Sequence, residues 1–165
     1  MAVSTTQSIW RSGGGDQTRT AYCGSGVMAA QFYISGASAT GTAVQATSTN
    51  TAAVVLPAGA IVVEIQAVCA ATGGTTPTFD MGFTLYGTST ATNQGLVAAA
   101  VATTGKLVIN QASGTAGANM GTTMSTSNLV TITGGGTSGD APTGGSISGT
   151  ILYYVVDPLN GQQNV

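Results

Sequence analysis

The chain has 165 residues, of which 42% are hydrophobic and only 5% are charged, with a formal net charge of −2 and no histidine. This length fits one domain with a sizeable core, and the composition is the opposite of the charged, weakly hydrophobic signature of disorder. Three cations cannot form the basic patch that phosphate binding requires, so we expect no nucleic-acid partner. No apolar run approaches the roughly 18 residues of a membrane span, and the first residues lack the features of a secretion signal, so we expect synthesis in the cytoplasm and no membrane partner.

The first twenty residues show no sustained periodicity, yet they contain the only tryptophan, Trp10, beside Arg11 and ahead of three glycines at 13–15. An aromatic and basic pair before a glycine hinge is typical of an arm that docks on a partner. A tryptophan that folds back on its own domain fits the same residues. We therefore predict an N-terminal arm over residues 1–20, with Trp10 and Arg11 as candidate contact residues, and one domain over residues 21–165.

Residues 56–86 predict two strands and a connection, which we expect to form the centre of the fold. Pro57-Ala58-Gly59 predicts a turn, since proline fixes φ and glycine tolerates positive φ. The odd positions from 61 to 69 are all apolar, whereas Glu64 and Gln66 lie between them, which is the alternation of a half-buried strand. Residues 78–85 repeat the alternation more sharply. We interpret the two strands as a pair with one face toward a core and the other in solvent.

The remaining segments predict short strands separated by Gly-rich, Ser-rich and Thr-rich turns. Residues 95–102 fit either a short helix or a strand, and residues 114–121 predict a surface loop. The class that follows is all-β, an antiparallel β-sandwich or jelly-roll of about eight strands with an extended N-terminal arm. The further strands are expected at residues 22–35, 41–51, 52–56, 106–110, 128–133 and 146–156.

The residues that enzymes use for proton transfer are scarce. Without histidine the only candidate acid and base are Glu64 and Asp80, which we place on adjacent strands on the solvated face, where exposed solubilising charges explain them better than glycoside hydrolysis does. Cys23 and Cys69 cannot supply the ligands of a zinc site, and we interpret them as small buried thiols, with a disulfide or a reactive thiol as alternatives. We therefore predict no enzyme activity, no metal and no cofactor.

A chain with so little charge has a weak barrier to close association. Its surface is expected to consist mostly of Thr, Ser, Ala, Gly and Asn, with Met120, Met124, Tyr153 and Tyr154 adding apolar area. Such a surface favours tight packing against identical copies or a larger assembly over a monomer with an ordinary polar surface.

Four segments resemble small virion proteins of tailed bacteriophages, in particular head decoration or cement proteins. The resemblance lies in a strand introduced by Leu-Pro-x-Gly, a Pro-Thr-x-Asp-x-Gly strand and a C-terminal strand that ends in tyrosines, in that order, over about 100 of the 165 residues. The segments are LPAGAIVVEIQAVCAA (56–71), TTPTFDMGF (75–83), NLVTIT (128–133) and GGSISGTILYYVV (144–156).

The resemblance implies a β-sandwich, often a homotrimer, that binds the outer surface of the capsid in the virion and cements adjacent subunits of the major capsid protein. It also implies an extended terminal arm that contacts the capsid or a neighbouring copy, a role that residues 1–19 with Trp10 and Arg11 fit. A Gly-rich and Thr-rich body this poor in charge also suits a phage tail, knob or fibre component that contacts the host surface, which is the alternative function.

Overall fold

The computed structural model describes residues 27–36, 40–47, 50–73, 75–85, 91–102, 105–135 and 140–155, and in these residues it contains strands and no α-helix. The predicted arm, with Trp10 and Arg11, lies outside the described residues, as does Cys23. The strands are β1 (Met28–Ser35), β2 (Thr40–Ala43), β3 (Gln45–Thr47), β4 (Asn50–Ala53), β5 (Val55–Leu56), β6 (Ala60–Cys69), β7 (Thr78–Leu85), β8 (Ala91–Val101), β9 (Gly105–Asn110), β10 (Asn128–Gly134) and β11 (Ser146–Val155).

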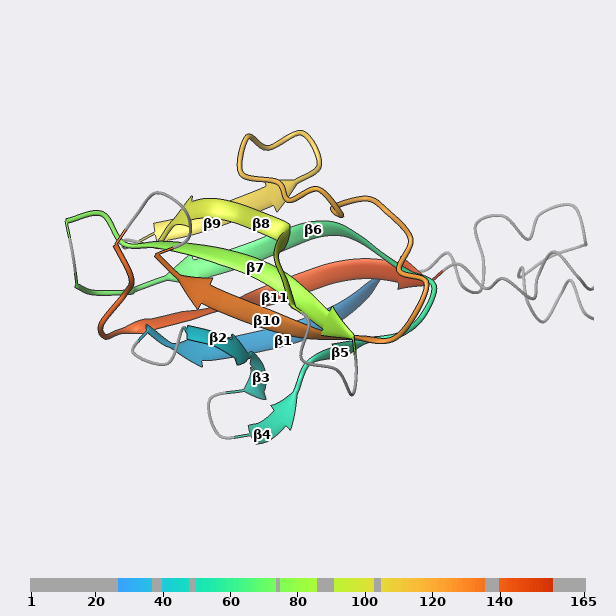
Figure 1. The fold of residues 1–165 in the computed structure, drawn as a ribbon, viewed down its shortest axis with the longest axis horizontal. Coiled ribbons are helices and arrows are strands. Elements are labelled where there is room, and N and C mark those ends of the chain that lie inside the picture. Colours follow the sequence, from blue (N-terminus) through green and yellow to red (C-terminus); the bar gives the residue numbers. More distant parts are fainter. Residues whose placement is uncertain are drawn as a thin grey trace, which may run out of the picture.

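Two antiparallel sheets pack face to face, and their strands run lengthwise through the molecule (Figure 1). One sheet has six strands in the order β4-β3-β1-β11-β6-β9, and the other has the order β2-β10-β7-β8 with β5 also paired to β10. The predicted all-β antiparallel sandwich is therefore confirmed, with eleven described strands in place of about eight.

Two of the three additional strands arise where the chain changes sheets, and the third is β8. β2 pairs with β10 in one sheet and β3 pairs with β1 in the other, so the chain crosses at Val44, and it returns at Val54 between β4 and β5. Both valines are buried, and both are bonded to Val130 of β10, which accepts from Val44 N at 3.1 Å and donates to Val54 O at 3.0 Å. These crossings divide the predicted strands at 41–51 and 52–56 into four short ones.

The two strands of residues 56–86 do not pair with each other, contrary to the sequence-based interpretation. β6 lies between β11 and β9 in the six-stranded sheet, whereas β7 lies between β10 and β8 in the other. The connection over 70–77 therefore passes from one sheet to the other. The predicted turn before β6 is confirmed, with Gly59 at φ 83° and a hydrogen bond from Ala60 N to Pro57 O at 3.1 Å.

Apolar side chains from both sheets fill the space between them. Phe79 and Met81 of β7 alternate inward as predicted, and Cys69 is a buried free thiol in the same cluster. Met120 and Met124, which we expected on the surface, are buried as well. The largest fully buried side chains are Phe32, Phe79, Leu56, Ile65, Met81, Leu96, Ile109, Met120, Ile132, Ile147, Ile151 and Val44.

Residues 91–101 form a strand and not a helix because their backbone groups are bonded on both sides. β7 pairs with one edge of β8, and the segment 115–119 bonds to the other through Ala98 N to Thr115 O at 2.9 Å and Gly117 N to Leu96 O at 2.9 Å. The predicted surface loop over 114–121 therefore covers this edge and places Met120 in the core.

The first and last described strands lie side by side, since Met28 of β1 pairs with Tyr153 of β11. The start of β1 and the end of β11 therefore lie at the same end of the six-stranded sheet, at the right of Figure 1. The described residues contain no helix that could cross a membrane.

Candidate functional site

The outer face of the six-stranded sheet is a continuous surface over four paired strands, β1, β11, β6 and β9. The pairing of β1, β11, β6 and β9 places outward-facing residues in three rows across the sheet, and we call these twelve residues the outer face. The rows are Ala29, Leu152, Glu64 and Asn110; Gln31, Thr150, Gln66 and Val108; and Tyr33, Ser148, Val68 and Lys106.

The outer face has few charges and exposes apolar side chains at its centre and edge. Glu64 and Lys106 are its only ionisable groups apart from Tyr33, and Gln66 Nε2 donates to Glu64 Oε1 at 2.7 Å. Val68 is 50% exposed and Val108 is 58% exposed. Tyr33 alternates with the buried Phe32 and Ile34 of β1, so its side chain projects away from the space between the sheets. Depletion of charge with exposed aliphatic and aromatic groups is the composition of the centre of a protein interface.

A groove of about 390 Å³ continues the outer face toward the end of the sheet where β1 begins and β11 ends. It begins where β11 shifts register against β6 between Leu152 and Tyr153. The extra residue at this shift is Val63 of β6, which lines the groove. The alternation of β11 continues through it, so Tyr153 packs against the core while Tyr154 lines the groove. The two tyrosines, both expected on the surface, therefore take different roles. The groove is lined by Ile61, Val63, Asn110, Gln111, Ala112, Gly121 and Tyr154.

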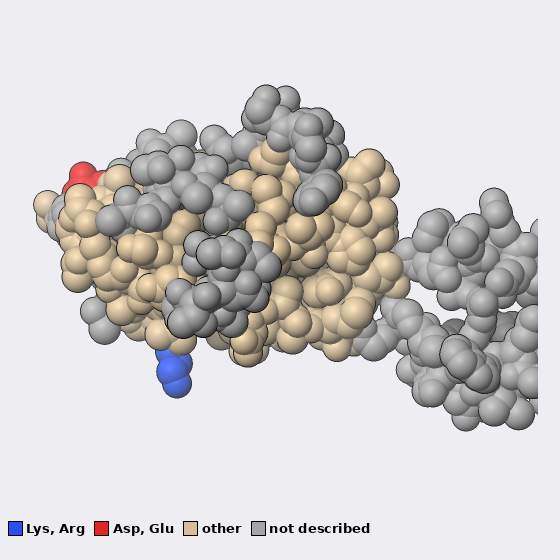
Figure 2. Space-filling view, turned by 90° about the horizontal axis from the view of Figure 1, so that it is seen from below, with Lys and Arg blue, Asp and Glu red and all other residues tan. Residues whose placement is uncertain are grey.

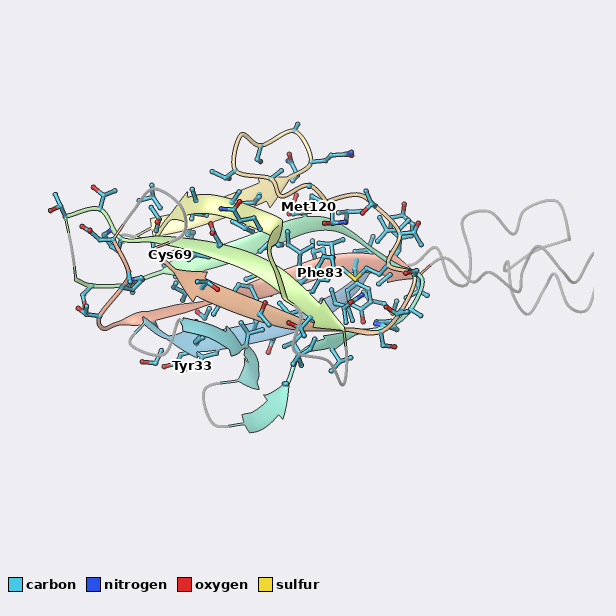
Figure 3. The ribbon with its side chains drawn as sticks, in the orientation of Figure 1. Tyr33, Cys69, Phe83 and Met120 are labelled. Atoms are coloured by element: carbon cyan, nitrogen blue, oxygen red, sulfur yellow. The ribbon has the colours of Figure 1, made fainter. Side chains whose placement is uncertain are left out.

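A smaller pocket of about 130 Å³ lies beside the start of β10, and we call it the Asn128 pocket. Asn128 is 3% exposed, and its Nδ2 donates to Thr126 O at 2.8 Å, which fixes the amide with Oδ1 as the remaining acceptor. Phe83 lies in the same half of the domain as Met120 in Figure 3. The pocket is lined by Phe83, Asn119, Thr122, Thr123, Met124, Ser125, Thr126 and Asn128.

The two carboxylates considered for acid and base catalysis are not brought together. Glu64 faces outward from the six-stranded sheet, and Asp80 alternates with inward residues of the other sheet, so the thickness of the sandwich separates them. Asp80 is not solvated as predicted, because it is 3% exposed.

The Asp80 carboxylate has a structural role in the five-stranded sheet. Its Oδ1 accepts from Ala99 N at 2.6 Å and its Oδ2 from Gln94 Nε2 at 2.9 Å. Phe79 pairs with Ala100 and Met81 with Val97, so Asp80 of β7 faces two residues of β8, Ala98 and Ala99, and a bulge results. Sequence alternation could place Asp80 opposite the core, but it carries no signal for this bulge.

The described residues contain no cluster of three or more His, Cys, Asp or Glu that could hold a metal ion. Lys106 is their single Lys or Arg, and on the side seen in Figure 2 nearly all described atoms belong to uncharged residues. The geometry therefore offers surfaces and small pockets for packing and hydrogen bonding, on a body with little electrostatic preference.

The chain was compared with known families, curated proteins and solved structures. No family model and no curated protein matches it. Its fold is similar to that of a chain in a solved structure described as the capsid of Ralstonia phage GP4, with a TM-score of 0.55 and 23% sequence identity. The similarity covers 82% of this chain and 87% of that chain, so it includes nearly the whole of both folds.

Proposed function

We propose that this chain is a non-enzymatic structural protein of a phage virion that binds the outer surface of the capsid and cements adjacent subunits of the major capsid protein. The observation that carries the proposal is the fold shared with a chain of a phage capsid over 82% of the present chain. The resemblance of the sequence to head decoration proteins supports the same conclusion.

The outer face is the proposed contact surface. Four strands about 4.8 Å apart and side chains about 6.8 Å apart along each strand give its twelve residues roughly 400 Å². A stable interface buries about 800 Å² on each partner, so this face supplies around half of the required area. The rest would come from the groove beside Tyr154, from the segment that contains Trp10 and Arg11, and from neighbouring copies.

Attachment at many equivalent positions lets modest contacts add up on one shell. We propose a homotrimer as the repeating unit, since three copies suit three-fold positions between capsomers. Light scattering behind a sizing column tests this: the expected mass is three times the 16.1 kDa of the chain. A monomeric mass at all concentrations would contradict a trimer in solution. Copies would then associate only on the capsid.

The proposed surface can be tested with substitutions at exposed positions. Val68→Lys and Val108→Lys place charges on the outer face, and we expect them to lower occupancy on purified capsids that lack this protein. Val101→Lys is the matched control, because Val101 is 42% exposed on β8 of the other sheet. Unchanged occupancy of both outer-face variants would contradict the assigned surface. Binding of the wild-type protein to host cells in place of capsids would favour a tail, knob or fibre role.

A further inference from the structure

The Asn128 pocket combines three features of a site for an aromatic side chain. It has one buried hydrogen-bond acceptor, an aromatic wall and no charged lining residue. Asn128 Oδ1 accepts no hydrogen bond from any described residue, although the side chain is almost fully buried. A buried polar atom without a partner costs on the order of 1–3 kcal/mol, so a ligand that donates a hydrogen bond there gains affinity.

The size of the pocket points to a ring. Its volume of about 130 Å³ is close to that of an engineered protein cavity of about 150 Å³ that holds benzene. Phe83 forms one wall, and aromatic rings favour offset or edge-to-face contact with a second ring. An occupant that fits is therefore an aromatic ring with one hydrogen-bond donor and no charge.

The position of the Phe83 ring is constrained from behind by Gly95 of β8. A Cβ atom at this position would lie 2.7 Å from Phe83 Cε1, closer than real Cβ atoms approach. It would also lie 3.3 Å from Asn119 Oδ1, another lining residue. The glycine thus lets the Phe83 ring approach β8 more closely than any side chain at this position would allow.

The pocket lies at the end of the domain where β1 begins. Met124, which lines it, donates from N to Ala60 O at 2.8 Å and accepts from Gly59 N at 2.7 Å. Ala60 pairs with Val155, and two residues earlier in β11 Tyr153 pairs with Met28. The start of β1 and the pocket are therefore connected across two neighbouring strands.

We infer that the Asn128 pocket binds the indole ring of Trp10 from the same molecule, with indole Nε1–H donating to Asn128 Oδ1. Tryptophan is a donor only, so it matches a site whose free atom is an acceptor. Trp10 precedes Val27 by seventeen residues, and such a chain spans up to roughly 60 Å when extended, so it can reach a pocket connected to the start of β1 through two neighbouring strands. Anchoring of Trp10 would hold Arg11 against this end of the domain.

Fluorescence tests this inference in the isolated full-length protein, because Trp10 is the only tryptophan. We expect acrylamide to quench Trp10 several-fold less than it quenches a free tryptophan derivative. Ser125→Phe fills the pocket from an exposed lining position and should restore free quenching. Ser127→Phe is the matched control at an exposed position outside the lining, and it should leave Trp10 protected.

Each other result would overturn the inference. Quenching of the wild type as fast as the free derivative would show that Trp10 is outside any pocket. Protection that Ser125→Phe leaves unchanged would place the ring elsewhere. Protection that disappears on dilution would assign the pocket to Trp10 of a neighbouring copy. None of these measurements uses capsids, so their failure is distinct from failure of the proposed function.

Discussion

The Asp80 carboxylate accepts a hydrogen bond of 2.6 Å from the backbone N–H of Ala99, a residue with φ of 52° at the bulge of β8. Alanine in this left-handed region costs on the order of 1–2 kcal/mol. The charged hydrogen bond compensates for that cost, since bonds to charged groups contribute about 1.5–3 kcal/mol. The pair therefore holds the edge strand of the five-stranded sheet in a conformation that its own sequence disfavours.

We expect Asp80→Ala to lower the free energy of unfolding by about 2–4 kcal/mol, because the part-buried donors Ala99 N and Gln94 Nε2 lose their hydrogen bonds to this carboxylate. Ala99→Gly should instead be neutral or stabilise by up to about 1 kcal/mol, because glycine tolerates positive φ. Urea denaturation measures both. A loss of stability in Ala99→Gly comparable to that in Asp80→Ala would contradict the role assigned to the bulge.

Phe79 and Phe83 are two residues apart on β7 but differ in burial. Phe79 is fully buried, so Phe79→Ala should cost about 3–5 kcal/mol. Phe83 is half-buried at the edge of the Asn128 pocket, and we expect Phe83→Ala to cost roughly half as much, less than strict alternation along β7 predicts. Equal losses in thermal or urea denaturation would show that Phe83 is as enclosed as Phe79.

Burial raises the pKa of the Cys69 thiol from 9.0 to about 11. In the unfolded chain the thiol ionises first, so its contribution to stability is fully present below pH 9.0 and is lost as the pH rises to about 11. The loss is on the order of 2–3 kcal/mol.

Urea titrations at a series of pH values measure this dependence. Cys69→Ala and Cys69→Val remove the thiol while leaving every other titratable group in place. Whatever their absolute stability, both variants should lose less stability than the wild type across this alkaline range. Parallel curves for all three proteins would contradict the burial of an un-ionised thiol.

Deletion of residues 1–15 removes Trp10, Arg11 and the glycine run while leaving every described strand intact. We expect the body to stay folded with a thermal midpoint lowered by loss of the Trp10 contact in the Asn128 pocket. We expect occupancy on purified capsids to fall, because the outer face alone supplies only part of a stable interface. Unchanged occupancy would show that the N-terminal segment does not contribute to the capsid contact. Loss of folding would show that the segment belongs to the domain.

Local patterning located most of the long strands, because alternation and turn residues act over neighbouring positions. Glu64 and Gln66 between apolar residues marked β6, and Pro57 with Gly59 marked its beginning. Pairing was not predictable in the same way. β6 and β7 follow each other in sequence, yet β6 pairs with β11 and β9, and β7 pairs with the distant β10 as well as with the following β8.

The sites depend even more on distant contacts. Asp80 alternates as a solvent-facing residue should, and its burial follows from a bulge in β8 that no local pattern announces. The Asn128 pocket likewise combines β7 with the segment 119–128. The outer face was predictable in neither composition nor extent. Only Ala29, Asn110, Thr150 and Ser148 among its twelve residues are of the types expected on the surface, and its rows exist only once β1, β11, β6 and β9 are in register.

The most direct test of the cementing role is the temperature at which purified capsids rupture and release DNA, measured with and without saturating protein. We predict that wild-type protein raises this temperature, that Val101→Lys raises it equally, and that the variant carrying both Val68→Lys and Val108→Lys does not. Capsids that bind the protein yet rupture at the same temperature with and without it would contradict the central claim that this sandwich reinforces a phage shell.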